Sequence, residues 1–219
     1  MARFTHIVRR YGLACAAGVA LATGAFAQED HRLPQYRITD LGALDGGQSF
    51  ATSMNDDALA VGWSHKVVKK SPRGERGRTV ARHAFGWSPT LGMIDLGTLG
   101  GSFSEARDIN ADGVVVGFAE TPEGTTHAFV ACFAGGTAVM WDLNDLVVTP
   151  DPMKPMLGAQ ASFGTFFEAT AINDANEIVA CAFLRETGDI GGFLLRPRTA
   201  RIVIEPGLTP PKELFEATY

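Results

Sequence analysis

Long hydrophobic runs are absent from the chain after residue 27. The large apolar residues there stand mostly in groups of three to six, and glycine is frequent, at 25 residues. Short runs of this kind favour strands and turns, and they exclude a long amphipathic helix or a second membrane-spanning segment. The sequence therefore predicts a strand-rich chain, and 219 residues suffice for one domain or two small ones.

Catalytic and metal-binding motifs are also lacking. The sequence contains no G-x-S-x-G, H-E-x-x-H or C-x-x-C motif, no phosphate-binding glycine loop and no complete calcium-binding series. An alternative is a glycan-active hydrolase or lyase, for which Glu105 and Glu168 are candidate carboxylates without an evident partner. We predict no catalytic residue, no cofactor and no metal ion.

Cysteine is rare, and acidic residues outnumber basic ones. Only Cys132 and Cys181 follow residue 27, both in apolar runs where thiols are favoured, although an oxidising compartment would permit a disulfide. Residues 1–27 hold three of the 19 basic residues and none of the 24 acidic ones, which leaves 16 basic residues and a net charge of −8. An acidic chain argues against nucleic acid as a partner.

Residues 1–27 have the composition of a secretory signal peptide. Three arginines precede an apolar stretch over residues 11–22, and the Ala-Phe-Ala triplet ending at Ala27 fits a signal-peptidase site. The stretch is shorter than the roughly twenty residues of a membrane anchor, which is the alternative. A twin-arginine signal and lipidation of Cys15 fit the flanking residues poorly. We predict export to the periplasm or the cell exterior after cleavage near Ala27.

The remaining chain repeats one pattern three times. Residues 39–64 and 94–119 align without a gap and share D-L-G, S-x-A and V-G pieces. A looser third copy joins WDLN at 141–144 to FFEATAINDANEIVACA at 166–182, across an insertion of about sixteen residues. A period of roughly fifty residues indicates a repeat fold.

A second block follows each copy, which gives four strand-sized pieces per unit. The block reads HAFGW at 83–87, HAFVA at 127–131 and GGFLL at 191–195, and each is followed by another short apolar stretch, the last being ARIVIE at 200–205. YRITDLG at 36–42 resembles the final strand of a unit.

Turn residues separate the strand-sized pieces within each copy. Residues 55–58, 110–113 and 173–176 are rich in Asn, Asp or Gly, which accept positive φ angles, so each segment predicts a hairpin turn. Gly62 and Gly117, in the strands that follow, predict a close approach of a neighbouring strand or aromatic ring.

The spacing of D-L-G, I-N, V-V-G and H-A-F resembles the HAF repeat of bacterial extracellular proteins. The resemblance is plainest over residues 95–129 and extends from about Tyr36 to Glu205. It implies an extracellular β-repeat protein and no particular activity or catalytic residue. Members of that family usually have more copies than the three visible in this chain.

Four strands per unit predict a β-propeller-like array. Propellers need about four or more blades to close a ring, so three units predict an open or irregular closure, or self-association. A compact β-barrel or sandwich is the alternative. We expect residues 28–205 to form this domain and residues 206–219 to be a proline-containing tail, disordered or loosely docked.

The repeated polar residues favour structural roles over chemistry. His83 and His127 hold equivalent positions, where ligands for one metal would not converge, so we predict structural hydrogen bonds. The D-L-G aspartates predict capping of turns or strand ends. These are Asp40, Asp95 and Asp142.

Two insertions predict loops on the scaffold, where binding function is common. Residues 146–162 contain three prolines and predict an irregular loop. Residues 65–82 carry seven basic residues against Glu75, and this segment predicts either a solvated loop or a contact for an anionic glycan, a lipid headgroup or a second copy. The seven are Lys66, Lys69, Lys70, Arg73, Arg76, Arg78 and Arg82.

The sequence favours a secreted, non-catalytic binding or self-association module of unknown ligand. A truncated copy of a longer repeat protein is a further alternative.

Overall fold

A computed structural model of the chain describes residues 35–69, 79–134, 136–148, 163–185, 187–198 and 214–218. The predicted signal peptide lies outside them. Residues 39–219 form one compact unit, separate from residues 1–38, and the fold described below is that of the second unit. Its described residues form strands and one 3-10 turn, so the predicted all-β class is confirmed. No helix long and apolar enough to cross a membrane occurs in the described ranges.

The described strands form three sheets, one for each predicted repeat, although the D-L-G piece that begins the second copy at 94–97 lies in the last strand of the first sheet. The first comprises β1 (Ser49–Met54), β2 (Ala60–Lys69), β3 (Thr79–Ser88) and β4 (Gly92–Gly97). The second comprises β5 (Ser104–Ile109), β6 (Val114–Glu120), β7 (Thr126–Ala134) and β8 (Thr137–Asp142), followed by the 3-10 turn η1 (Leu143–Asp145). The third has the order β10-β11-β12-β13-β9 and comprises β9 (Val147–Val148), β10 (Phe163–Ile172), β11 (Ile178–Leu184), β12 (Ile190–Pro197) and β13 (Phe215–Thr218).

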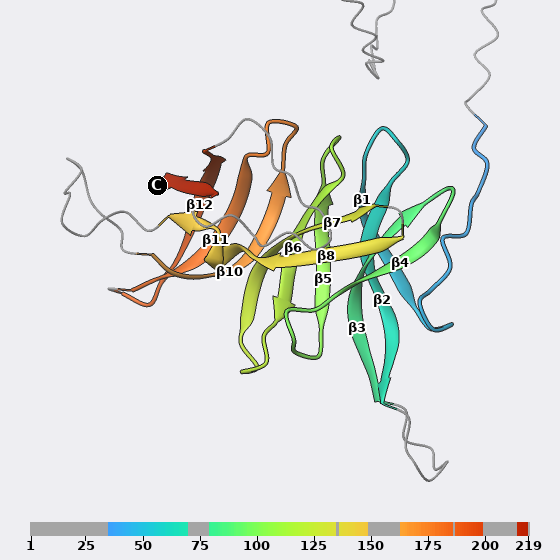
Figure 1. The fold of residues 1–219 in the computed structure, drawn as a ribbon, viewed down its shortest axis with the longest axis horizontal. Coiled ribbons are helices and arrows are strands. Elements are labelled where there is room, and N and C mark those ends of the chain that lie inside the picture. Colours follow the sequence, from blue (N-terminus) through green and yellow to red (C-terminus); the bar gives the residue numbers. More distant parts are fainter. Residues whose placement is uncertain are drawn as a thin grey trace, which may run out of the picture. The chain divides into compact units, whose positions relative to one another are not determined.

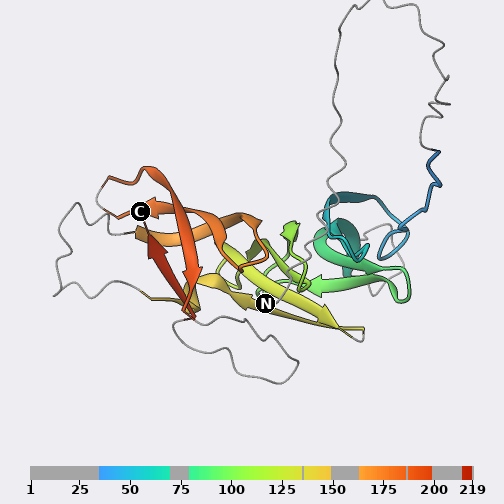
Figure 2. The same cartoon turned by 90° about the horizontal axis from the view of Figure 1, so that it is seen from above.

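The second sheet packs between the first and the third (Figures 1 and 2). Alternate residues of β6 point to opposite faces, as in any strand. Val115 lies in an apolar cluster with Val61 of the first sheet, whereas Val116 lies in a cluster with Phe166 and Ile178 of the third. No described sheet closes into a barrel, and the predicted open, propeller-like array is confirmed.

The three predicted hairpin turns are present and share one conformation. The first asparagine of each organises the turn, since Asn55 Oδ1 accepts hydrogen bonds of 3.1 and 3.0 Å from amides two and four residues later. The fourth turn residue has a positive φ in every copy, 60° at Ala58, 78° at Gly113 and 61° at Asn176. This backbone conformation explains the Asn, Asp and Gly content of the turns.

Gly62 and Gly117 lie where the sequence predicted a close approach. A Cβ atom at Gly62 would stand 2.0 Å from the carbonyl oxygen of Phe50, and one at Gly117 would stand 2.1 Å from that of Glu105. Both oxygens belong to the neighbouring strand of the same sheet. Any side chain at these positions would push β1 or β5 away.

The third sheet differs from the prediction at its outer strands. The predicted final strand at 200–205 lies outside the described residues, and β13 pairs with β12 instead. The interpretation of the tail as disordered or loosely docked is wrong for Leu214 and Phe215, which are 5% and 0% exposed. Burial of these two apolar side chains favours docking of the strand.

Three further segments depart from their predicted form. Residues 36–42 do not form a strand, although the equivalent D-L-G piece at 95–97 ends β4. Residues 146–162 are not irregular at their start, since β9 pairs in parallel with β13. Residues 65–82 are not a loop at either end, because β2 and β3 continue pairing as far as Lys69 and Thr79.

Cys132 and Cys181 are not joined by a disulfide. Cys132, on β7, packs against the apolar cluster between the second and third sheets. Cys181 lies on β11, where it is partly buried. The preference for thiols that the apolar runs predicted is confirmed for this pair.

Candidate functional site

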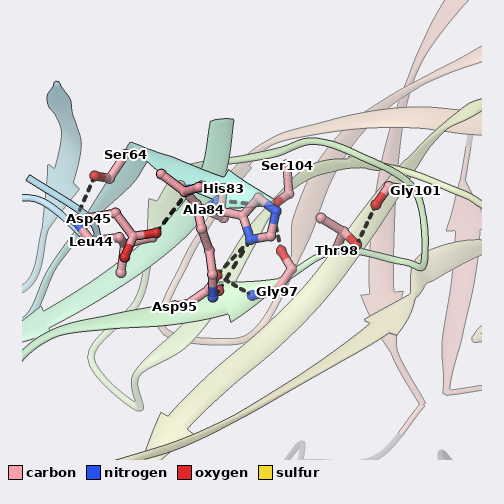
Figure 3. Close-up of polar contacts among 12 residues, drawn as sticks. Leu44, Asp45, Ser64, His83, Ala84, Asp95, Gly97, Thr98, Gly101 and Ser104 are labelled. Carbon is pink, nitrogen blue, oxygen red and sulfur yellow. Dashed lines mark hydrogen bonds and ion pairs between the residues drawn. The ribbon is translucent and has the colours of Figure 1, made fainter. Parts of the chain in front are cut away.

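A histidine–aspartate pair joins β3 to β4 (Figure 3). The His83 ring and the Asp95 carboxylate point toward each other, with Nδ1 lying 3.0 and 3.2 Å from the two carboxylate oxygens. Asp95 also accepts a hydrogen bond of 2.9 Å from the Gly97 amide and forms an ion pair with Lys66. The predicted structural roles of His83 and Asp95 are confirmed by these bonds.

The charge of Asp95 follows from its surroundings. Burial raises the pKa of this carboxyl, but hydrogen bonds from His83, Lys66 and the Gly97 amide outweigh burial and lower the pKa to about 2. Asp95 is therefore ionised at neutral pH, and its hydrogen bonds are charge-assisted.

The second repeat builds the same pair. His127 Nδ1 lies 2.5 Å from Asp142 Oδ2, and Asp142 Oδ1 accepts a hydrogen bond of 2.8 Å from the Asn144 amide. Asp40 makes the corresponding backbone bond, since its Oδ1 accepts from the Gly42 amide at 2.9 Å. The aspartate of each D-L-G piece thus caps a turn, as predicted.

The D-L-G glycine and the following serine are connected as well, a link that the sequence analysis missed. Ser104 on β5 donates to the carbonyl of Gly97 at 2.5 Å and accepts from the Ala84 amide at 2.8 Å (Figure 3). Ser49 likewise donates to the carbonyl of Gly42 at 2.7 Å. The serine that recurs in the S-x-A pieces was the sequence signal that could have predicted this link. Ser104 ties the first sheet to the second.

The asparagines of the turns form a ladder across the three sheets. Asn55 Nδ2 donates to the carbonyl of Asn110 at 3.0 Å, and Asn110 Nδ2 donates to the carbonyl of Asn173 at 3.1 Å. Asn110 Nδ2 also donates to Asn176 Oδ1 at 2.8 Å. Asn110 is only 3% exposed, so these bonds are shielded from water.

An ion-pair network also crosses the three sheets. Arg82 of the first sheet pairs with Glu105 of the second at 2.6 Å. Arg107 lies between two carboxylates, 3.8 Å from Glu105 and 2.8 Å from Glu168 of the third sheet. The two candidate carboxylates of the enzyme interpretation are therefore brought together, but each is held by arginine.

The seven predicted basic residues are not brought into one site by the described structure. Lys66 is engaged by Asp95, and Lys69 lies at the end of β2. Arg82 contacts Glu105 and also lies over the Trp63 ring, 5.5 Å from its centroid. The others lie outside the described residues; they are Lys70, Arg73, Arg76 and Arg78.

A cleft of about 360 Å³ lies beside the second histidine–aspartate pair. Trp141 and Met140 line it together with His127 and Asp142. Thr125 Oγ1 lies 3.3 Å from His127 Nε2, but the same hydroxyl is 2.8 Å from that of Thr121 in the adjoining turn. These contacts stabilise the turn. No group of three or more metal-binding side chains occurs in the described ranges.

One face of the third sheet is apolar and exposed. Val116 and Val130 pair in the second sheet and are fully buried against the third. The equivalent pair in the third sheet is Val179 and Leu194, and Val179 is 44% exposed. Phe183 and Ile190, which pair with each other on the same face, are also exposed, at 47% and 62%. We call this surface the outgoing face: Val179, Phe183, Ile190 and Leu194.

The face of the first sheet that points away from the second sheet is also exposed. Ile109 and Ile172 end β5 and β10 at equivalent positions and are 5% and 7% exposed, but Met54 at the end of β1 is 65% exposed. Ala51 is exposed, whereas its equivalents in the other two sheets are buried. We call this surface the incoming face: Ala51 and Met54.

Comparison with known proteins gives no relative. No family model, curated protein or solved structure matches the chain.

Proposed function

We propose that this chain is an exported, non-catalytic repeat module that works by binding or self-association. The observation that carries the proposal is the exposure of apolar side chains on the outgoing and incoming faces, including Met54 at 65% and Phe183 at 47%. Exposed apolar surface on a folded protein is typical of interaction sites. The repeated polar residues support the proposal, because His83, Asp95 and Asn110 all bond within the scaffold.

An anionic glycan or lipid headgroup is the partner class proposed for the basic segment. β2 and β3 remain paired as far as Lys69 and Thr79, the described residues on either side of residues 70–78. Four of the seven basic residues stand in those nine positions. A segment with this charge would attract anions over roughly 8 to 10 Å at physiological salt.

Two measurements on the chain from Gln28 onward test this function. Sedimentation velocity should show self-association, and cosedimentation should show binding to phosphatidylglycerol vesicles or dextran sulfate. Phosphatidylcholine vesicles and neutral dextran are the controls, and deletion of residues 70–78 should abolish the anionic binding alone. A chain that stays monomeric and binds none of these probes would refute the proposal.

The glycan-active enzyme is the weaker alternative. It needs two carboxylates facing a substrate, whereas Arg107 lies between Glu105 and Glu168.

A further inference from the structure

The junction between the first and second sheets is marked by two side chains of the first repeat. The Thr52 hydroxyl lies 3.2 Å from the carbonyl oxygen of Val61 in its own sheet and 2.9 Å from that of Ala106 in the next. Asn55 Nδ2 donates to the carbonyl of Asn110. The bonds to the carbonyls of Ala106 and Asn110 run from the first sheet to the second, so they fix the register between the two sheets.

The third sheet carries the equivalent two side chains on the side that no described sheet covers. Thr170 is the repeat equivalent of Thr52, and its hydroxyl lies 3.2 Å from the carbonyl oxygen of Val179, which corresponds to Val61. Thr170 is exposed. Asn173, the equivalent of Asn55, is also exposed. The third sheet thus presents the polar pattern with which the first sheet holds its neighbour.

The first sheet presents the matching acceptors. Ala51 and Asn55 are the repeat equivalents of Ala106 and Asn110, whose carbonyl oxygens accept the bonds from the preceding repeat. The carbonyl of Asn55 accepts one bond, from the Ala58 amide at 3.1 Å, and a carbonyl oxygen has two lone pairs. Ala51 and Met54 are exposed beside these acceptors.

We infer that two copies of the chain join head to tail, with the outgoing face of each covering the incoming face of the other. The inference rests on the proposed function and specifies its self-association. Thr170 and Asn173 of one copy donate to the carbonyls of Ala51 and Asn55 of the second, while Val179 packs beside Met54. The junction repeats the one already present between the first and second sheets.

A second copy is the occupant because each chain carries both halves of the junction. A head-to-tail contact either closes into a ring or grows into an open filament. Two copies of a three-sheet chain supply six sheets, which lies within the about four to eight blades of known propellers. Closure with two identical junctions satisfies both open faces of both copies, and the product is a dimer.

Glutamate substitutions on either face test the junction. Met54→Glu and Val179→Glu each place charge in both junctions of the dimer, whereas Leu91→Glu, at a 49% exposed site in the turn between β3 and β4, is the matched control. Sedimentation velocity of the chain from Gln28 onward should show a dimer for the unmodified chain and for Leu91→Glu. Each face variant should dimerise at least about a hundredfold more weakly.

Mixing the two face variants tests the head-to-tail arrangement. A Met54→Glu chain and a Val179→Glu chain together retain one undamaged junction, so the mixture should dimerise more strongly than either variant alone. A contact between identical faces would give no such rescue, and one variant would keep its dimer. Absence of rescue overturns the inference, as does an assembly that grows with concentration beyond two copies.

Thr170→Val supplies a test that leaves the apolar faces intact. It removes the hydroxyl and keeps the side-chain shape, and each dimer contains the bond twice, so dimerisation should weaken about tenfold. Unchanged dimerisation overturns the inference. Self-association that ignores every one of these variants, or binding to vesicles by a strictly monomeric chain, would refute the junction and leave the proposed function standing.

Discussion

Replacing Ala58 with glycine should make the chain more stable. Ala58 has a φ of 60°, which costs an L-residue with a Cβ roughly 1 to 2 kcal/mol. Glycine adopts this angle freely but loses about 0.5 to 1 kcal/mol through the entropy of the unfolded chain. The expected net gain in the free energy of unfolding is about 0.5 to 1 kcal/mol.

The other two turns provide matched comparisons at the same backbone position. Gly113→Ala should destabilise the chain by about 1 kcal/mol, through strain alone, because the added Cβ would stand 3.6 Å from Leu59 Cδ1, an ordinary contact. Asn176→Gly should also destabilise, by about 1 kcal/mol, because it removes the buried 2.8 Å bond from Asn110.

Equilibrium urea unfolding of the chain from Gln28 onward measures all three variants. Opposite signs for Ala58→Gly and Asn176→Gly are the diagnostic result, since a general preference of the turn for glycine would give the same sign. A lower free energy of unfolding for Ala58→Gly would refute the common turn geometry.

Further predictions concern the pH dependence of stability, the close backbone contact at Gly117 and the docking of β13. Because the pKa of Asp95 is lowered to about 2 from 3.8, its contribution to stability is complete above about pH 4 and is lost as pH falls toward 2. Urea midpoints should therefore fall more steeply over that interval in the unmodified chain than in Asp95→Asn. Gly117→Ala should cost about 3 kcal/mol or more in thermal unfolding, because its Cβ would meet a carbonyl at 2.1 Å, whereas Gly192→Ala, with nothing within 4 Å, should be close to neutral. Phe215→Ala should cost about 3 to 5 kcal/mol, since the ring is fully buried, and a change below about 1 kcal/mol would show that β13 does not dock.

The repeat pattern predicted most of the fold because its signals are local. Asparagine and glycine mark positive φ angles at Asn176 and Gly113, and the absence of a side chain at Gly117 marks a close approach. These requirements act within a few residues, so they are visible in a single sequence. The all-β class and the strand composition of the first two sheets follow directly.

The strand that pairs next to β12 in the third sheet, β13, could not be predicted in the same way. β13 pairs with β12 and with β9, and β9 is far from β13 in the sequence. Its short apolar piece, centred on Phe215, resembles many surface segments. Only the space beside β12 distinguishes it, and that space is set by tertiary packing.

The candidate interaction faces were also beyond the sequence. Val116 and Val179 hold equivalent positions in equivalent strands, yet one is buried and the other is 44% exposed. The difference arises because a neighbouring sheet covers the first and none of the described residues forms a sheet over the second. Likewise, Thr52 and Thr170 aligned with Arg107 in the middle repeat, which concealed their shared role.

The central claim is that polar side chains of one repeat hold the next sheet in place, and a double-mutant cycle between Asn110 and Asn176 tests it most directly. The two side chains belong to different sheets, are both 3% exposed and bond at 2.8 Å. Urea unfolding of Asn110→Ala, Asn176→Gly and the double variant should give a coupling free energy of about 1 to 2 kcal/mol. A coupling near zero would contradict the account.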